Sequence, residues 1–442
     1  RLFLLEFLLI NKSNKNTDMP KYTQIFTQVL QLLDWKLFDS IVNKYEGDRG
    51  AKGISCRSLL ATMIFACLAG SDSLKPTVDA LETIGGTLPN LGIERVPSRS
   101  NLGYCLAHRP SDIFREFFEA YASALSKRLY GKHKPNRLKR KVFSIDSTVI
   151  SLCLSLFDWA RFHHRKGAAK AHTLLDHDGL IPSVVQVTAG SEHDAPVFER
   201  MLDDLAWKLL PGSIVLMDRG YVSFDLFRKM SGMGLVFVTR LKKNMVYEVR
   251  EEHAVPNVGG LVSDRKVFFQ SQAGMECSEL RLVTARVVVR GKEKEMSFLT
   301  NSTTLAASTI VLLYKARWEV ENFFKSLKQN LEIESFMGTS QNAVETQIYA
   351  SMISMLLLKE LKEISDSKRK EANLKPFGFS SFVTSLRPSL FRITPLENWL
   401  QKPFAPPDDA ESSGQLALFP PGFLGQQTVP KCKITPRPPW RW

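Results

Sequence analysis

The chain has 442 residues, of which 44% are hydrophobic and 24% charged, as in an ordinary globular protein of two or three domains. A formal net charge of +14 favours a polyanionic partner, nucleic acid first and an acidic membrane surface second. No apolar run reaches the roughly 18 residues that a membrane-spanning helix needs, so we expect no membrane span.

The cysteines and the first residues indicate the redox environment of the protein and where its fold begins. Six cysteines lie far apart without a Cys-x2-Cys pair, which argues against a zinc ribbon or a disulfide framework and favours reduced thiols in a cytoplasmic protein. Residues 1–18 run from apolar RLFLLEFLLI into polar sequence before Met19. We interpret them as an upstream or non-native extension rather than as part of the fold.

Residues 19–131 are predicted to form a helical N-terminal domain that binds DNA. FTQVLQLLDWKLFDSIVNKY and SLLATMIFACLAG repeat apolar residues every three or four positions, and Ser98 or Ser100 can cap a further helix. Short helices joined by small turns suit a helix-turn-helix module and equally any helical bundle. The basic linker KHKPNRLKRK, 132–141, is well placed for phosphate contacts.

An α/β catalytic domain is predicted over residues 142–345. Three antiparallel strands, followed by strands that helices separate, is the order of a ribonuclease H-like mixed sheet, and Asp178-Gly179 is a hairpin-turn signal. The predicted strands are 142–150, 171–177, 181–189, 213–218 and 235–240, and the predicted helices are 195–209, 223–232, 309–331 and 344–363.

Three further segments complete the predicted organisation. Residues 241–305 are read as a β-rich insertion into the catalytic domain, because they contain KVFFQ, LRLVTARVVV and MSFLT. Residues 346–402 are predicted to be a C-terminal helical segment. Residues 403–442 are rich in Pro and Gly without any period, which predicts a disordered tail.

Two aspartates stand out on predicted strands. Asp146 lies in VFSIDSTVI, where alternation places it on the face opposite Ile145. Asp218 ends SIVLMD, an apolar run of the kind that is buried on both faces of a sheet. A carboxylate at the carboxyl end of such a strand is costly without a partner, which makes Asp218 a candidate for a functional site.

Helical geometry selects Glu321 as a third carboxylate. At about 100° per residue, an apolar stripe from Leu313 to Leu331 faces the core, and Glu319 points away from the polar stripe beside it. An isolated helix with i, i+4 ion pairs would explain the same spacing. The polar stripe contains Tyr314, Arg317, Glu321, Lys325 and Lys328.

Three carboxylates suit phosphodiester chemistry. Two divalent ions about 4 Å apart can stabilise the attacking and the departing oxygen of an in-line displacement. Carboxylate oxygens are hard ligands, which Mg²⁺ and Mn²⁺ prefer. Water and the scissile phosphate would complete the coordination, so Asp146, Asp218 and Glu321 are a sufficient protein contribution.

The motifs resemble those of bacterial insertion-sequence transposases of the DDE class. The resemblance is to the subgroup with a Tyr-x2-Arg-x3-Glu-x6-Lys signature and an inserted strand-rich segment, and Tyr314, Arg317, Glu321 and Lys328 match this signature. FSIDST and LMDRGY are similar to the first and second aspartate motifs of these transposases. The resemblance extends over about residues 20–360.

The resemblance implies a DNA transposase that binds terminal inverted repeats and catalyses metal-dependent cleavage and strand transfer of an insertion sequence. Asp146, Asp218 and Glu321 would be the catalytic residues and would bind two Mg²⁺ or Mn²⁺ ions. The implied partners are double-stranded DNA, as transposon ends and target, and a second copy of the chain in a synaptic homodimer; no membrane is implied. The side chains expected to contact DNA are Tyr314, Arg317, Lys325, Lys328, Arg219, Lys170 and His172.

Other interpretations stay open. A catalytically inactive DNA-binding regulator derived from a transposase would have no use for an acidic cluster beside phosphates, whereas a nuclease without strand transfer would keep it. A zinc or iron hydrolase is disfavoured, because the histidines around His172 and His193 form no His-Glu-x2-His pattern. Asp194 is a rival carboxylate, which we interpret as an N-cap because Pro196 follows at a helix start.

Overall fold

The computed structural model describes residues 23–84, 88–89, 92–129, 139–152, 157, 159–163, 166–255, 260–270, 274, 280–289, 291–331 and 335–402. The predicted extension 1–18, the predicted tail 403–442 and residues 132–138 of the predicted linker lie outside the described residues. All described residues belong to one compact unit. Of the helices in those ranges, none has the length and apolarity needed to cross a membrane.

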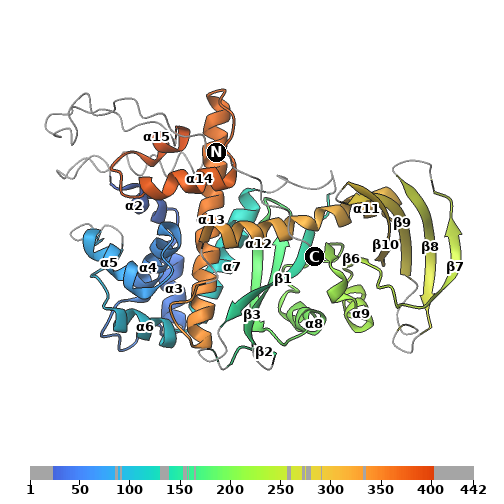
Figure 1. Cartoon of the computed structure of the whole chain (residues 1–442), viewed down its shortest axis with the longest axis horizontal. Coiled ribbons are helices and arrows are strands. Elements are labelled where there is room, and N and C mark those ends of the chain that lie inside the picture. Colours follow the sequence, from blue (N-terminus) through green and yellow to red (C-terminus); the bar gives the residue numbers. More distant parts are fainter. Residues whose placement is uncertain are drawn as a thin grey trace, which may run out of the picture. The chain divides into compact units, whose positions relative to one another are not determined.

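The N-terminal part of the chain is helical, as predicted (Figure 1). The helix CRSLLATMIFACLA is apolar on almost every side and is nearly completely buried, so it forms the centre of this part. Ser55 caps it, and Gly70 ends it with a φ of 76°. Ser98 caps a later helix by accepting the N–H of Asn101 at 3.1 Å, which confirms one predicted cap. The helices are α2 (Ile25–Leu30), α3 (Trp35–Lys44), α4 (Cys56–Ala69), α5 (Leu74–Ile84), α6 (Arg99–His108) and α7 (Ser111–Arg128).

One long helix joins the N-terminal helices to the sheet. Helix α13 (Gln341–Glu371) is buried along most of its length and contacts α4, α6 and α7 as well as strand β4 (Ile181–Ala189) (Figure 1). These elements therefore share one hydrophobic core. The predicted domain boundaries at 131 and 345 stay predictions. The remaining C-terminal elements are α14 (Phe379–Leu386), η3 (Arg387–Ser389) and α15 (Leu396–Gln401).

The central sheet is mixed. Strand β1 (Val142–Leu152) pairs antiparallel with β3 (Lys166–Asp176), which pairs antiparallel with β4, and the turn between β3 and β4 has Gly179 at a φ of 80°. On its other side β1 pairs parallel with β5 (Ile214–Met217), and β5 pairs parallel with β6 (Val236–Arg240). The five predicted strands are thus confirmed as elements, and a short strand, β2 (Arg161–His163), also pairs with β3.

The predicted β-rich insertion extends this sheet instead of forming a separate one. Strand β10 pairs antiparallel with β6, and the order continues through β9 and β8 to β7 (Figure 1). Helices α8 (Asp194–Asp204) and α9 (Phe224–Gly232) pack on one face of the sheet, and α11 (Ala307–Ala316) packs on the other. The insertion strands are β7 (Tyr247–His253), β8 (Leu261–Phe269), β9 (Leu280–Val289) and β10 (Lys292–Thr300).

The helix predicted over 309–331 is divided at Arg317 into α11 and α12 (Trp318–Leu331). The backbone stays right-handed there, but the N–H of Arg317 bonds to Tyr314 and the N–H of Val320 bonds to Arg317. These i to i−3 bonds tighten one turn of the helix. The predicted core-facing stripe is confirmed as buried except at Ala316, which is partly exposed. Its buried members are Leu313, Val320, Phe324, Leu327 and Leu331.

Candidate active site

Strand pairing places Asp146 and Asp218 beside each other. Ile145 of β1 is paired with Met217 of β5, so the aspartate that follows each of these residues lies at the same position along two adjacent parallel strands. Asp218 comes directly after β5 and accepts the N–H of Arg219, where the chain turns into the short 3-10 helix η2 (Arg219–Tyr221). The two predicted aspartates are therefore neighbours on the sheet.

Arg317 connects Asp146 to Glu321, the third predicted carboxylate. Its Nη1 lies 3.2 Å from Oδ2 of Asp146, and its Nη2 lies 2.6 Å from Oε1 of Glu321. Only 7% of the arginine side chain is exposed. The buried guanidinium of Arg317, at the tightened turn between α11 and α12, thus contacts strand β1.

The surroundings of the Asp146 carboxyl group disfavour its charged form. The pKa of Asp146 is raised from 3.8 to about 6 in total: burial is the largest cause and the negative charges of Asp218 and Glu321 add to it, while Arg317 and the N–H of Ser147 oppose the shift. That N–H donates to Oδ1 of Asp146 at 2.8 Å. The charges of Asp218 and Glu321 thus act on Asp146, and we call these three carboxylates the acidic cluster.

The donor set of this cluster suits a hard divalent cation. It consists of carboxylate oxygens, and the raised pKa of Asp146 is a shift that a bound cation would reverse. Arg317 already supplies positive charge between Asp146 and Glu321. As the side chains are placed, the described residues include no group of three His, Cys, Asp or Glu that could enclose a metal ion. The chemistry of the residues therefore fits Mg²⁺ or Mn²⁺. In the structure itself, the positive charge beside Asp146 and Glu321 is that of Arg317.

Other residues of the predicted signature surround the cluster. The ring of Tyr314 packs on Phe298, with centroids 4.9 Å apart, and the guanidinium of Arg317 lies 5.6 Å from the Tyr314 centroid. Burial raises the pKa of the Tyr314 phenol. Lys328 donates to the carbonyl of Val149 on β1 at 3.1 Å, and Lys325 is exposed on the same helix.

Asp194 does not cap α8, contrary to our interpretation of it. The N-cap is His193, and no side chain makes the capping bond. The Asp194 carboxylate instead accepts the hydroxyl of Ser147 at 2.9 Å and lies 3.3 Å from Nζ of Lys170. Ser147 belongs to β1 and Lys170 to β3, so the Asp194 carboxylate contacts two adjacent strands of the sheet. One of its partners, Ser147, directly follows Asp146 in the chain.

Two residues expected to contact DNA are engaged inside the protein. Lys170 is 13% exposed and donates to the carbonyl of Glu192 at 2.7 Å. His172 has no exposed surface, and its Nε2 lies 3.0 Å from the hydroxyl of Thr188. Burial lowers the pKa of His172 to about 4, so the imidazole is neutral at pH 7. As placed, His172 has no exposed surface with which to contact a DNA strand.

Tyr221 is a site residue that the sequence analysis missed. It is 1% exposed, and burial raises the pKa of its phenol, with further contributions from Asp194, Asp146 and Asp218. The phenol therefore stays protonated among three carboxylates. Its only signal in the sequence was its place in LMDRGY, three residues after Asp218.

Carboxylates that hold divalent cations are the groups that metal-dependent phosphoryl transfer uses. Residues 137–357 match the family model described as "Transposase DDE domain", and residues 22–94 match a "Domain of unknown function (DUF4372)". Since the first match covers half of the chain, this chain belongs to the Transposase DDE domain family. The predicted class of protein is confirmed, while the Tyr-Arg-Glu-Lys signature stays a prediction.

Curated relatives agree with this assignment. A Sinorhizobium fredii protein named as transposase y4zB is 29% identical over 60% of this chain and 71% of its own length. A Geobacillus stearothermophilus protein named as a transposase for insertion sequence element IS5377 is 26% identical over 56% and 62%. A Synechocystis protein named as a transposase for element IS4SA is 25% identical over 57% and 68%. A solved piggyBac transposase synaptic complex with hairpin DNA matches with a TM-score of 0.41 and 12% identity, covering 81% of this chain and 78% of that one.

Proposed function

We propose that this chain is a DNA transposase that binds terminal inverted repeats and catalyses metal-dependent cleavage and strand transfer of an insertion sequence. The observation that carries the proposal is the acidic cluster of Asp146, Asp218 and Glu321, which lies within the matched DDE domain. The strand order β4-β3-β1-β5-β6, with β1, β5 and β6 parallel, supports a ribonuclease H-like core.

Asp146, Asp218 and Glu321 would hold the metal. When bound, two Mg²⁺ or Mn²⁺ ions would activate the attacking water or 3′-hydroxyl and stabilise the departing oxygen of the phosphodiester. The residues themselves keep three negative charges together, and Arg317 neutralises part of that charge in the metal-free protein. The N–H of Ser147 fixes the orientation of the Asp146 carboxylate.

Cations around the cluster would hold the DNA. Lys325 projects from α12 into solvent, and Lys328 lies one turn further on, against β1. Arg219 follows Asp218 directly and is partly exposed. Tyr314, Arg317 and these three residues would contact the phosphates of the transposon end, which fixes the scissile bond beside the carboxylates. A homodimer would pair two such ends.

The test is cleavage of a plasmid that carries the ends of the element. Purified protein with Mg²⁺ should nick and cut at the element's ends, and Glu321→Gln should abolish cutting while end binding is kept. Glu319→Gln, two residues earlier on the same helix, is the matched control and should cut like the wild type. Equal cutting by Glu321→Gln and the wild type would remove Glu321 from the site.

The same assay separates the alternatives. A DNA-binding regulator would bind the ends with no cutting in any metal, and the match to a DDE domain does not favour it. A nuclease without strand transfer would release the element but never join its 3′ ends to a target plasmid. Joined products therefore distinguish a transposase from both.

A further inference from the structure

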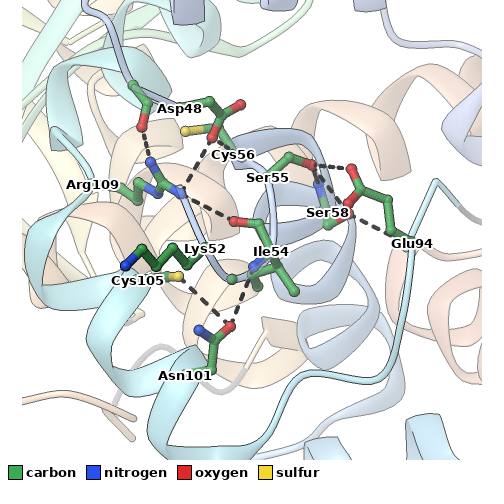
Figure 2. Close-up of polar contacts among 12 residues, drawn as sticks. Asp48, Lys52, Ile54, Ser55, Cys56, Ser58, Glu94, Asn101, Cys105 and Arg109 are labelled. Atoms are coloured by element: carbon green, nitrogen blue, oxygen red, sulfur yellow. Dashed lines mark hydrogen bonds and ion pairs between the residues drawn. The ribbon is translucent and has the colours of Figure 1, made fainter. Parts of the chain in front are cut away.

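Polar side chains hold a loop in the N-terminal helical part (Figure 2). Arg109 donates to the carbonyl of Ile54 at 3.1 Å and lies 3.4 Å from the carboxylate of Asp48. Asp48 in turn accepts the N–H of Cys56 at 2.8 Å, at the start of α4. The loop 47–55, GDRGAKGIS, is thus fixed at both ends.

The middle of this loop packs on helix α6. Asn101 accepts the N–H of Ile54 at 3.3 Å (Figure 2), and a Cβ added to Gly53 would come within 2.1 Å of the Asn101 side chain. Arg95, just before α6, donates to the carbonyls of Lys52 and Gly53 at 2.8 and 3.2 Å. The loop, Arg95 and the first turn of α6 therefore form one continuous surface.

This surface displays cations that the protein itself does not neutralise. The side chains of Lys52, Arg95 and Arg99 are exposed, and within the described ranges none of the three forms an ion pair. The neighbouring carboxylate of Glu94 accepts the hydroxyl of Ser55 at 2.9 Å (Figure 2), and among the described residues it forms no ion pair with these cations. We call Lys52, Arg95 and Arg99 the basic loop surface.

Helix α6 continues the surface without negative charge. Its sequence, RSNLGYCLAH, contains no acidic residue. On its exposed side, the ring of Tyr104 is 61% exposed and stacks on His108 with centroids 4.0 Å apart. Exposed cations beside a helix that carries exposed Tyr and His rings and no acidic residue have the chemistry of a nucleic-acid surface.

We infer that the basic loop surface binds the phosphate backbone of double-stranded DNA. The inference rests on the proposed function for its choice of partner, and it names the side chains of the predicted N-terminal DNA-binding domain that would contact phosphate. Lys52 lies within the match to a domain of unknown function over residues 22–94, and Arg95 and Arg99 follow the end of that match. Phosphate contacts need exposed cations on a rigid frame, and the inward bonds of Arg109, Asn101 and Asp48 supply that frame. The acidic cluster is a separate site that acts on the DNA held here and by α12.

The experiment compares two triple variants of the full chain with equal loss of charge. Lys52→Ala/Arg95→Ala/Arg99→Ala removes the surface, and Lys36→Ala/Lys370→Ala/Lys375→Ala removes three exposed cations elsewhere. Binding of a fluorescein-labelled 40-base-pair duplex is measured by anisotropy between 50 and 300 mM KCl, without Mg²⁺. The first variant should bind at least about tenfold more weakly at 150 mM, with a log–log salt slope shallower by about 2 to 3, because each phosphate contact contributes about 0.9. The control should retain most of the affinity and slope.

Equal affinity and slope for the two triple variants would overturn the inference. A second measurement does not depend on the variants folding well: acetylation of Lys52 in the wild type, read by mass spectrometry, should slow severalfold when the duplex is added, while that of Lys36 should not. Unchanged acetylation of Lys52 would also overturn the inference. The proposed function fails separately, since it requires Mg²⁺-dependent cutting that these binding measurements do not involve.

Discussion

The guanidinium of Arg317 lies 3.2 Å from the carboxylate of Asp146, although 171 residues separate them in the chain. The same guanidinium is 2.6 Å from Glu321. A cation of the protein thus lies between two carboxylates that the proposed reaction needs as metal ligands. A cation that arrives at the cluster must share these carboxylates with Arg317, and a guanidinium released from them is free for a DNA phosphate.

Replacing Arg317 should therefore strengthen metal binding while it harms catalysis. In Arg317→Gln the cluster loses its internal cation, and Mn²⁺ binding without DNA, measured by electron paramagnetic resonance, should tighten by about tenfold or more. DNA cleavage should fall by about a hundredfold, since the phosphate contact is lost.

Arg281 provides the control for this substitution, because it is also a largely buried arginine and pairs with Asp264 at 2.6 Å, in the insertion. Arg281→Gln should leave Mn²⁺ affinity unchanged. If Arg317→Gln binds Mn²⁺ no better than the wild type, Arg317 does not compete with the metal.

The raised pKa of Asp146 predicts a pH-dependent stability difference in metal-free protein. In the folded state the pKa is about 6 instead of 3.8, so the unfolded chain releases this proton first as the pH rises. The wild type therefore loses stability between about pH 4 and pH 6, and Asp146→Asn does not. At pH 7.5 with EDTA the variant should be more stable by about 1–3 kcal/mol, and near pH 4 the difference should vanish.

Urea unfolding at the two pH values measures this difference. Asp79→Asn, at an exposed position of α5, is the control and should show the same small change at both values. If Asp146→Asn were more stable than the wild type by the same amount at pH 4 and at pH 7.5, the pKa of Asp146 would not be raised in the folded protein.

Much of the fold could be predicted because it depends on local sequence patterns. The alternation around Asp146 and the apolar run before Asp218 predict strands, and pairing of those strands puts the two aspartates side by side. The three-to-four-residue spacing from Leu313 to Leu331 correctly predicts which side of the helix is buried. The choice of Glu321 over Glu319 depended on the same periodicity.

What could not be predicted depends on partners far away in the chain. The carboxylate of Asp194 was interpreted as a cap because only its neighbours in sequence were considered, whereas its contacts come from Ser147 and Lys170. The pairing of β10 with β6, which merges the insertion with the core sheet, has no local signal. The burial of His172 likewise depends on the packing of β3 between its neighbours.

Asp194 should matter for catalysis although it lies outside the predicted set. Its carboxylate holds Ser147, the residue after Asp146, together with the ammonium of Lys170. Asp194→Ala should cost about 1–3 kcal/mol of stability, because a mostly buried cation loses its partner. The rate of cleavage should fall by roughly tenfold or more, since the Asp146 strand is less firmly positioned, while affinity for the duplex stays the same.

Asp203→Ala on the same helix is the comparison, because that aspartate is 71% exposed and pairs with Lys229. It should leave both stability and cleavage nearly unchanged. Asp194→Glu should restore part of the cleavage rate. Normal cleavage by Asp194→Ala would limit Asp194 to a structural role.

Lys328 should contribute one phosphate contact. It lies on α12 beside β1, where its ammonium donates to the carbonyl of Val149, and it is on the same polar stripe as Glu321. Lys328→Ala should weaken binding of an end-containing duplex and make the salt slope shallower by about 1, because one fewer counterion is displaced. Lys370→Ala, at an exposed position near the end of α13, should leave the slope unchanged. Identical slopes for Lys328→Ala and the wild type, in proteins that melt at the same temperature, would mean that Lys328 only ties α12 to β1.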